Sequence, residues 1–172
     1  KVIELDLEKF FDTVNHDRLM STLSKMISDS RTLHLIRLYL RAGIMEEGIV
    51  SQRQEGTPQG SPLSPLLSNI VLDELDKELE SRGHSYVRYA DDCSIYVSSK
   101  KAANRVCTGI TSYIETKLKL KVNEAKTKVS YPTQSTLLGF SFYKYKGKWE
   151  IRIAENSIER IKGKCKLITQ RS

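Results

Sequence analysis

Short β-type segments and amphipathic helical segments alternate along the first third of the chain. Apolar and polar side chains alternate over residues 1–7, which predicts a strand. Two helices are expected next: Asn15 or Asp17 caps the first, and the second ends at Gly43. Residues 44–54 then predict a hairpin with Glu47 and Gly48 in its turn. The expected order of this segment is strand, helix, helix, hairpin.

A loop rich in glycine and proline precedes the longest helical pattern of the chain. The loop covers residues 55–62, and apolar side chains then recur at steps of three and four from Leu63 to Leu79. Pro65 falls in the first turn, where proline is tolerated, and Gly83 ends the helix. A long amphipathic helix is therefore expected directly after the loop.

The remaining chain predicts a second hairpin, another amphipathic helix and a final group of strands. The hairpin covers residues 85–99 and turns at Asp91 and Asp92, and the helix covers residues 103–118. Three further strands and a basic helix follow, over 121–131, 137–145, 149–153 and from Asn156 onward. This order fits an α+β fold in which helices pack on one face of an antiparallel sheet.

The composition excludes several classes of protein. With 39% hydrophobic residues and a mean hydropathy of −0.41, the chain has an ordinary soluble composition. No apolar run approaches the ~20 residues that cross a bilayer, so no membrane partner is expected. The three cysteines, Cys93, Cys107 and Cys165, form neither a disulfide-rich pattern nor a CxxC motif, which indicates a reducing compartment. A secreted mini-protein and a zinc module are therefore poor interpretations.

The distribution of charge is more informative than the formal net charge of +7. Residues 1–99 carry 16 acidic and 11 basic side chains, whereas residues 100–172 carry 5 acidic and 17 basic ones. This division predicts an acidic site beside a surface that meets a polyanion such as nucleic acid. A solvated basic face is the alternative that charge alone leaves open.

Three acidic residues are the first candidates for chemistry. Asp6 lies near the end of a strand between two leucines, where a carboxylate is costly unless a cation stabilises it. Asp91 and Asp92 lie at a hairpin tip between apolar strands, and two neighbouring anions favour protonation or a bound divalent cation. The alternatives are a helix-capping role for Asp6 and a turn-forming role for the Asp pair.

The loop GTPQGSPLSPLL is the second candidate feature. Gly56 and Gly60 allow close backbone approach, and the prolines stiffen the loop. A rigid loop that leads into a helix N-terminus can hold an anion or a base edge, and Gln59 offers both a donor and an acceptor there. An ordinary loop with helix caps is the alternative.

In their order along the chain, these motifs resemble a known family. DLEKFF, GTPQGSPLSP, YADD, LKVNEAKTKV and LLGF together resemble the palm of a reverse transcriptase, and more narrowly that of proteins encoded by bacterial group II introns. The resemblance runs from Lys1 to about Gln170 and implies a polymerase palm over residues 1–155, including helices next to the fingers. Residues 156–172 would begin a basic helix that leads to a thumb. Because the chain begins at Lys1 rather than Met, we expect a piece of a longer protein.

The resemblance also implies roles for individual residues. Asp6, the carbonyl of Leu7, Asp91 and, less directly, Asp92 would bind two Mg²⁺ ions, with Mn²⁺ as a substitute. The other implied roles are these: Phe11 excludes a ribose 2′-hydroxyl, Gln59 and Gly60 contact the incoming nucleotide, Lys126 donates a proton to pyrophosphate, and Leu138, Gly139 and Phe140 grip the primer end. Lys128 is close enough in sequence to confuse the assignment of Lys126.

The function implied is RNA-directed DNA synthesis, with an intron RNA template, a DNA primer and dNTPs as partners. The protein would act in intron splicing and mobility, in a ribonucleoprotein of the bacterial cytoplasm. Two alternatives remain: a retron or diversity-generating reverse transcriptase, and a splicing-only maturase that binds RNA. Without fingers and thumb, the fragment is expected to be weakly active or inactive, and its exposed apolar surface could drive self-association.

Overall fold

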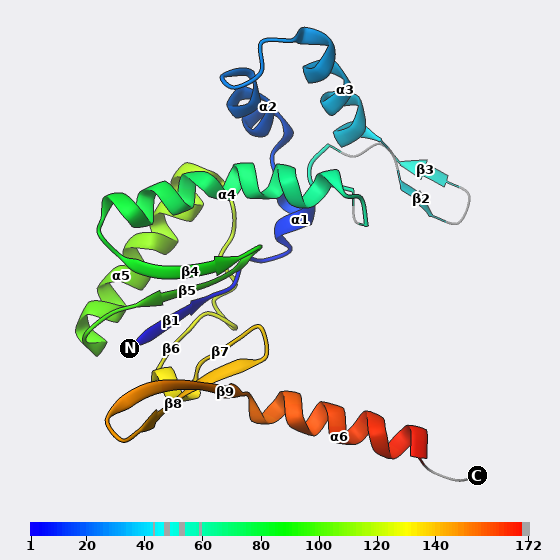
Figure 1. Cartoon of the computed structure of the whole chain (residues 1–172). Helices are drawn as coiled ribbons and strands as arrows, with labels where there is room; N and C mark the ends of the chain where they lie inside the picture. Colours follow the sequence, from blue (N-terminus) through cyan, green and yellow to red (C-terminus); the bar gives the residue numbers. More distant parts are fainter. Residues whose placement is uncertain (43, 47–48, 52–53, 59, 170–172) are drawn as a thin grey trace.

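A four-stranded antiparallel sheet forms the centre of the computed structural model (Figure 1). The structure describes residues 1–42, 44–46, 49–51, 54–58 and 60–169. The strand order is β4-β5-β1-β6, with bounds β4 Ser85–Tyr89, β5 Asp92–Tyr96, β1 Val2–Leu5 and β6 Lys128–Ser130. The predicted hairpin at Asp91 and Asp92 and the predicted first strand are therefore confirmed.

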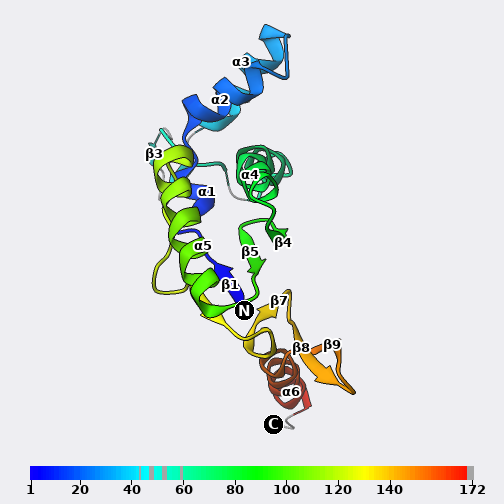
Figure 2. The same cartoon turned by 90° about the vertical axis from the view of Figure 1, so that its left-hand side faces the viewer.

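Two helices cover one face of this sheet, as the sequence predicts. They are α4 (Leu63–Ser81) and α5 (Lys100–Tyr113), which continues as a single π-helical segment, Ile114–Leu118. Figure 2 shows α5 running along the sheet beside β1. Alternation in the strands turns Ile3 and Ile95 toward these helices, where both side chains are fully buried. The helices bury matching apolar stripes that include Leu72 and Ile110.

A smaller helical unit extends from the end of β1. It contains α1 (Phe10–Thr13), α2 (His16–Ser24), α3 (Ser30–Arg41) and the hairpin of β2 (Ile44–Glu46) and β3 (Ile49–Ser51). Asn15, rather than Asp17, caps α2, because its side-chain oxygen accepts the backbone N–H of Arg18 at 2.9 Å. The expected turn at Glu47 and Gly48 and the helix end at Gly43 lie outside the described residues.

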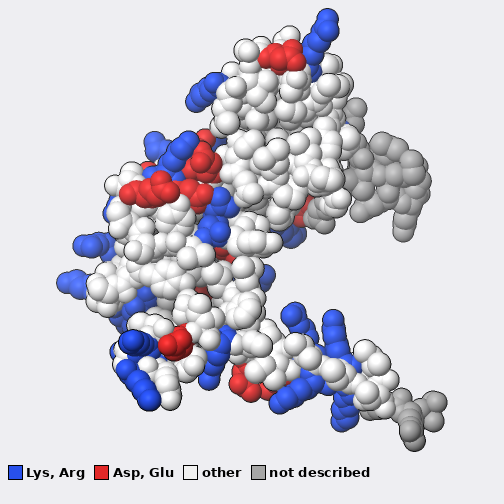
Figure 3. Space-filling view, viewed as in Figure 1, with Lys and Arg blue, Asp and Glu red and all other residues white. Residues whose placement is uncertain are grey.

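A three-stranded sheet and a long helix complete the chain. They are β7 (Thr136–Leu137), β8 (Phe140–Tyr145), β9 (Lys148–Ile153) and α6 (Glu155–Thr169), preceded by the 3-10 turn Pro132–Gln134. Every residue of β9 is exposed. Figure 3 shows Lys and Arg side chains spread along α6 and acidic side chains gathered over one end of α4. Within the described part of the chain, no helix has the length and apolar character needed to cross a membrane.

Two of the expected strands differ from the structure. The strand expected over residues 121–131 is wrong, because only Lys128–Ser130 forms a strand and Val122 contributes an isolated bridge to Leu7. Between them the chain turns, with the N–H groups of Lys126 and Thr127 both donating to the Asn123 carbonyl. The strand expected over 137–145 is interrupted by a left-handed turn at Leu138 and Gly139, whose φ angles are 51° and 80°.

Candidate active site

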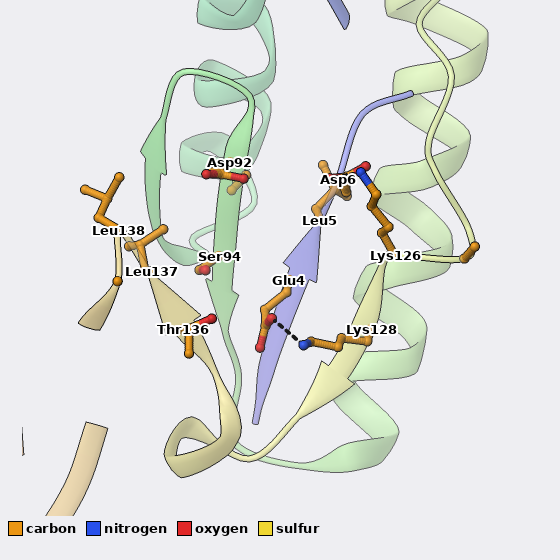
Figure 4. Close-up of a pocket in the computed structure, with 13 residues that line it drawn as sticks. Glu4, Leu5, Asp6, Asp92, Ser94, Lys126, Lys128, Thr136, Leu137 and Leu138 are labelled. Atoms are coloured by element: carbon orange, nitrogen blue, oxygen red, sulfur yellow. Dashed lines mark ion pairs between the residues drawn. The ribbon is translucent and has the colours of Figure 1, made fainter. Parts of the chain in front are cut away.

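The sheet face opposite the helices carries the polar candidates. Register places Glu4 opposite Ser94 and Leu5 opposite Cys93, so the next residues, Asp6 and Asp92, face each other across the two strands. A cavity of about 580 Å³ opens on this face and is lined by both carboxylates (Figure 4). Because successive side chains of a strand point to opposite faces, the same register of β1 and β5 turns one set of side chains toward the core and the other set toward the cavity.

Asp6 is held in place by the turn that follows residue 121. Its backbone N–H donates to the Thr127 hydroxyl at 3.2 Å, and its carbonyl accepts the N–H of Asn123 at 2.9 Å. The next residue, Leu7, is buried and bridges to Val122. Backbone bonds on both sides therefore fix the Asp6 side chain at the mouth of the cavity.

Two lysines face the cavity, each beside a different carboxylate. Lys126 Nζ lies 3.8 Å from Asp6 Oδ1, and Lys128 Nζ lies 3.1 Å from Glu4 Oε2 (Figure 4). Lys128 pairs with Glu4 in the β1–β6 register, whereas the turn before β6 brings Lys126 next to Asp6. Lys126 is therefore the lysine next to Asp6, which separates two residues that sequence spacing alone could confuse.

Asp91 and Asp92 differ in position. Tyr89 pairs with Asp92, so Ala90 and Asp91 form the two-residue turn of the hairpin, and Ala90 has a left-handed φ of 53°. Asp92 lines the cavity with Asp6, whereas Asp91 is not among the lining residues. The resemblance implies that Asp91 is the more directly engaged of the two. In the structure, the register of β5 turns Asp92 toward Asp6 and leaves Asp91 in the turn, and which of the two engages a metal more directly stays a prediction.

The electrostatics of the cavity favour a cation. Burial raises the pKa of the Asp92 carboxyl, the neighbouring carboxylates of Asp91 and Asp6 raise it further, and Lys126 lowers it. Among the described residues, no three His, Cys, Asp or Glu side chains are grouped closely enough to hold a metal ion by themselves. Mg²⁺ needs few protein carboxylates, because waters and phosphate oxygens complete its shell. Asp6 and Asp92 therefore fit a divalent metal ion whose remaining ligands are waters and the phosphate oxygens of a bound nucleotide.

The glycine-rich loop is bonded to the segment that carries Phe11. The N–H of Thr57 donates to the Phe11 carbonyl at 2.6 Å, and the N–H of Gly56 donates to the Val14 carbonyl at 2.8 Å. Phe11 is half-buried, and its ring meets the buried ring of Phe10 edge-on, with centroids 5.2 Å apart. The structure thereby brings two separate sequence motifs together beyond the end of β1.

The glycines of this loop have different surroundings. A Cβ on Gly56 would lie 2.7 Å from the Asp12 carbonyl oxygen, so close approach is required there, as expected. A Cβ on Gly60 would meet no atom within 4 Å, although its φ of +81° also suits glycine. The expected close approach at Gly60 therefore finds no protein neighbour among the described residues. Gln59 lies outside the described residues.

His16 supports this loop in a way that the sequence did not reveal. Its buried imidazole Nε2 lies 2.7 Å from the Gly56 carbonyl, and because a carbonyl oxygen can only accept, Nε2 donates. The two residues are 40 positions apart, and no spacing rule connects them.

The expected primer-end residues lie at the other side of the cavity. Leu138 and Gly139 line it, and the Gly139 carbonyl accepts the N–H of Ala154 at 2.9 Å, which ties this turn to the start of α6. Phe140 is 51% exposed and lies in an adjoining apolar depression instead. Of the three residues, two therefore share the cavity with Asp6 and Asp92.

Residues 1–142 match the family described as "Reverse transcriptase (RNA-dependent DNA polymerase)". The chain belongs to the reverse transcriptase family, and the polymerase-like α+β fold agrees with this. Apo telomerase from Candida tropicalis superposes with a TM-score of 0.65 over 88% of this chain and 35% of that chain, at 17% identity. That likeness concerns the fold alone.

Relatives of the chain within this family include a protein encoded by a group II intron. The chain is 26% identical to the group II intron-encoded protein LtrA of Lactococcus lactis subsp. cremoris over 91% of this chain and 38% of LtrA. Protein YkfC of Escherichia coli K12 is 35% identical over 76% of this chain and 43% of YkfC. The Escherichia coli retron Ec86 reverse transcriptase matches 76% of this chain and 38% of its own length at 29% identity. The chain thus spans less than half the length of these relatives.

Proposed function

We propose that this chain is the catalytic palm of an RNA-directed DNA polymerase that copies group II intron RNA into DNA. The observation that carries the proposal is that Asp6 and Asp92 face one cavity together with Lys126, in a chain of the reverse transcriptase family. The palm extends over residues 1–155, and residues 156–172 begin the basic helix leading toward a thumb. The protein acts in intron splicing and mobility, as a ribonucleoprotein of the bacterial cytoplasm.

Asp6, Asp91 and Asp92, with the Leu7 carbonyl, would hold two Mg²⁺ ions, for which Mn²⁺ can substitute. When bound, these ions activate the primer 3′-hydroxyl and stabilise the leaving pyrophosphate. Lys126, beside Asp6, would deliver a proton to the pyrophosphate oxygen. The carboxylates of the chain thus bind cations, and its lysine balances charge that develops on the leaving group.

The surrounding residues would position the nucleotides. Phe11 would lie against the incoming sugar and select dNTPs, and the loop bonded to its carbonyl would present Gln59 and Gly60 to the nascent base pair. Leu138, Gly139 and Phe140 would hold the primer end across the cavity. The basic side chains of α6 would bind the phosphates of the template–primer duplex.

Primer extension on intron RNA tests this function in the full-length protein. Asp6→Asn, Asp91→Asn and Asp92→Asn should each lower dNTP incorporation by at least about 100-fold while intron-RNA affinity stays within about twofold, because phosphate contacts elsewhere supply RNA binding. Asp73→Asn is the control, since Asp73 pairs with Lys77 on the surface of α4.

Wild-type extension by Asp6→Asn, Asp91→Asn or Asp92→Asn would refute the catalytic role of the residue replaced. Splicing without any primer extension by the unaltered protein would favour the splicing-only alternative. Replacing Mg²⁺ with Mn²⁺ in the wild-type assay should preserve extension, and Ca²⁺ should not, since Ca²⁺ takes more ligands at longer distances.

A further inference from the structure

The guanidinium of Arg88 joins two elements next to the cavity. Its Nε donates to Asp76 Oδ1 at 2.7 Å, and Nη2 pairs with Asp76 Oδ2 at 2.5 Å. Its Nη1 donates both to Asn69 Oδ1 at 3.0 Å and to the carbonyl of Ala90 at 2.9 Å. The Arg88 side chain is only 12% exposed. Four bonds therefore fix the guanidinium in one orientation.

The partners of Arg88 belong to parts of the site that are distant in sequence. Asn69 and Asp76 lie on α4, seven residues apart and hence on one face of the helix, whereas Ala90 lies in the turn directly before Asp91. The first turn of α4 is bonded to the glycine-rich loop, because the Ser64 hydroxyl donates to the Pro58 carbonyl. Arg88 therefore connects the turn that holds Asp91 and Asp92, here called the carboxylate turn, to α4, whose first turn is bonded to the glycine-rich loop.

The carboxylate turn has features that require external support. Ala90 adopts a left-handed φ of 53°, which is unfavourable for a residue with a Cβ. Asp91 and Asp92 are adjacent carboxylates, so their mutual repulsion also acts on this turn. The hydrogen bond from the charged Arg88 guanidinium to the Ala90 carbonyl is stronger than one from a neutral donor and offsets these costs.

We propose that Arg88, together with Asn69 and Asp76, is a positioning residue that fixes the Asp91–Asp92 turn relative to α4. The proposal rests on the polymerase function proposed above. Arg88 does not line the cavity, so it acts through the turn and touches no substrate. A lysine cannot replace it, because one ammonium lacks the planar fork that reaches a carboxylate, an amide and a carbonyl at once.

Arg88 also neutralises a charge behind the site. Its hydrogen bonds to Asp76 raise the pKa of the Arg88 guanidinium, so the pair stays charged. The Asp76 carboxylate acts on Cys93, next to Asp92, and, after burial, contributes to raising the pKa of that thiol to about 12. Loss of Arg88 would leave the Asp76 carboxylate on α4 without its cationic partner, behind the strands that carry the cavity carboxylates.

The test compares Arg88→Lys, Asn69→Ala and the control Arg82→Lys in the full-length protein. Arg82 makes a similar bond to Glu78 on α4 but has no contact with the turn. Arg88→Lys should lower kcat by about 10- to 100-fold, because a displaced catalytic group loses rate steeply. KM for dNTP should change less than about twofold, and Mn²⁺ affinity, measured by electron paramagnetic resonance without substrate, should fall about tenfold.

Asn69→Ala removes one acceptor and leaves the Asp76 pair, so it should shift kcat and Mn²⁺ affinity in the same direction by about two- to fivefold. If Arg88→Lys does not fold, the Asn69→Ala variant tests the positioning role instead. Variants that melt at lower temperature yet keep wild-type kcat and Mn²⁺ affinity while folded would overturn the proposal. If wild type and Arg82→Lys also fail to extend primers, the polymerase function fails instead, and Mn²⁺ binding still tests the positioning role.

Discussion

Gly56→Ala tests whether the glycine-rich loop is held by close backbone packing. The added Cβ would lie 2.7 Å from the carbonyl oxygen of Asp12 and 2.9 Å from its carbonyl carbon and Cα. These neighbours are backbone atoms of α1, so no side chain can rotate away. The loop must instead move, and the bonds from Gly56 to Val14 and from His16 to Gly56 lengthen.

The expected cost has two parts. Gly56 has a φ of +81°, and a Cβ in the left-handed region costs roughly 1–2 kcal/mol. Overpacking against the backbone adds about 1–3 kcal/mol. Gly147 has the same φ of +81° in the β8–β9 turn but no atom within 4 Å of an added Cβ, so Gly147→Ala should show the first part alone. The total is therefore about 2–5 kcal/mol for Gly56→Ala and about 1–2 kcal/mol for Gly147→Ala.

Urea unfolding followed by circular dichroism measures both free energies of unfolding. The difference between the two variants isolates the contact with Asp12, because the conformational cost is common to both. Equal destabilisation of the two variants would refute the reasoning, since the contact between the added Cβ and the Asp12 backbone would then cost no free energy. In the full-length polymerase, Gly56→Ala should also weaken dNTP use, and Gly147→Ala should leave it unchanged.

Two further changes address single side chains of the site. Phe10→Ala should lower the free energy of unfolding by about 3–5 kcal/mol, because the Phe10 ring is 2% exposed. Phe11→Ala should lower it less and raise the ratio of kcat/KM for rNTP over dNTP. A rise in that ratio for Phe10→Ala alone would contradict the assignment of Phe11 as the residue that selects the sugar. Lys126→Ala should lower single-turnover incorporation by about 100-fold and Lys128→Ala by less than about tenfold, because only Lys126 lies beside Asp6; equal losses would contradict this.

The sequence predicted the elements whose signals are local. Helical periodicity located α4 and α5, and the Asn15 side chain provided the cap of α2. The β4–β5 hairpin was evident because two β-rich runs flank Asp91 and Asp92. These features depend on residues a few positions apart, so no tertiary contact is needed to infer them.

Features that depend on distant partners could not be predicted. The strand expected over 121–131 forms only at Lys128–Ser130, because the chain before it turns at Asn123, whose N–H bonds across to the Asp6 carbonyl more than a hundred residues away. The bond between His16 and the Gly56 carbonyl and the bonds of Arg88 to α4 form only after the helices pack. Leu138 has a left-handed φ of 51°, a conformation that is uncommon for leucine and that the sequence therefore does not predict.

The stability of the core and the geometry of the site depend on the same strand register. Ile3 and Ile95 face the helices only if Glu4 and Ser94 face the cavity, because successive side chains of a strand point to opposite sides. A slip of one residue between β1 and β5 would bury carboxylates and expose the core, which costs far more than any single contact at the site. The opposition of Asp6 and Asp92 is therefore maintained by hydrophobic packing. What the core leaves unspecified is the turn between β4 and β5, and there the Arg88 bond to Ala90 supplies the missing constraint.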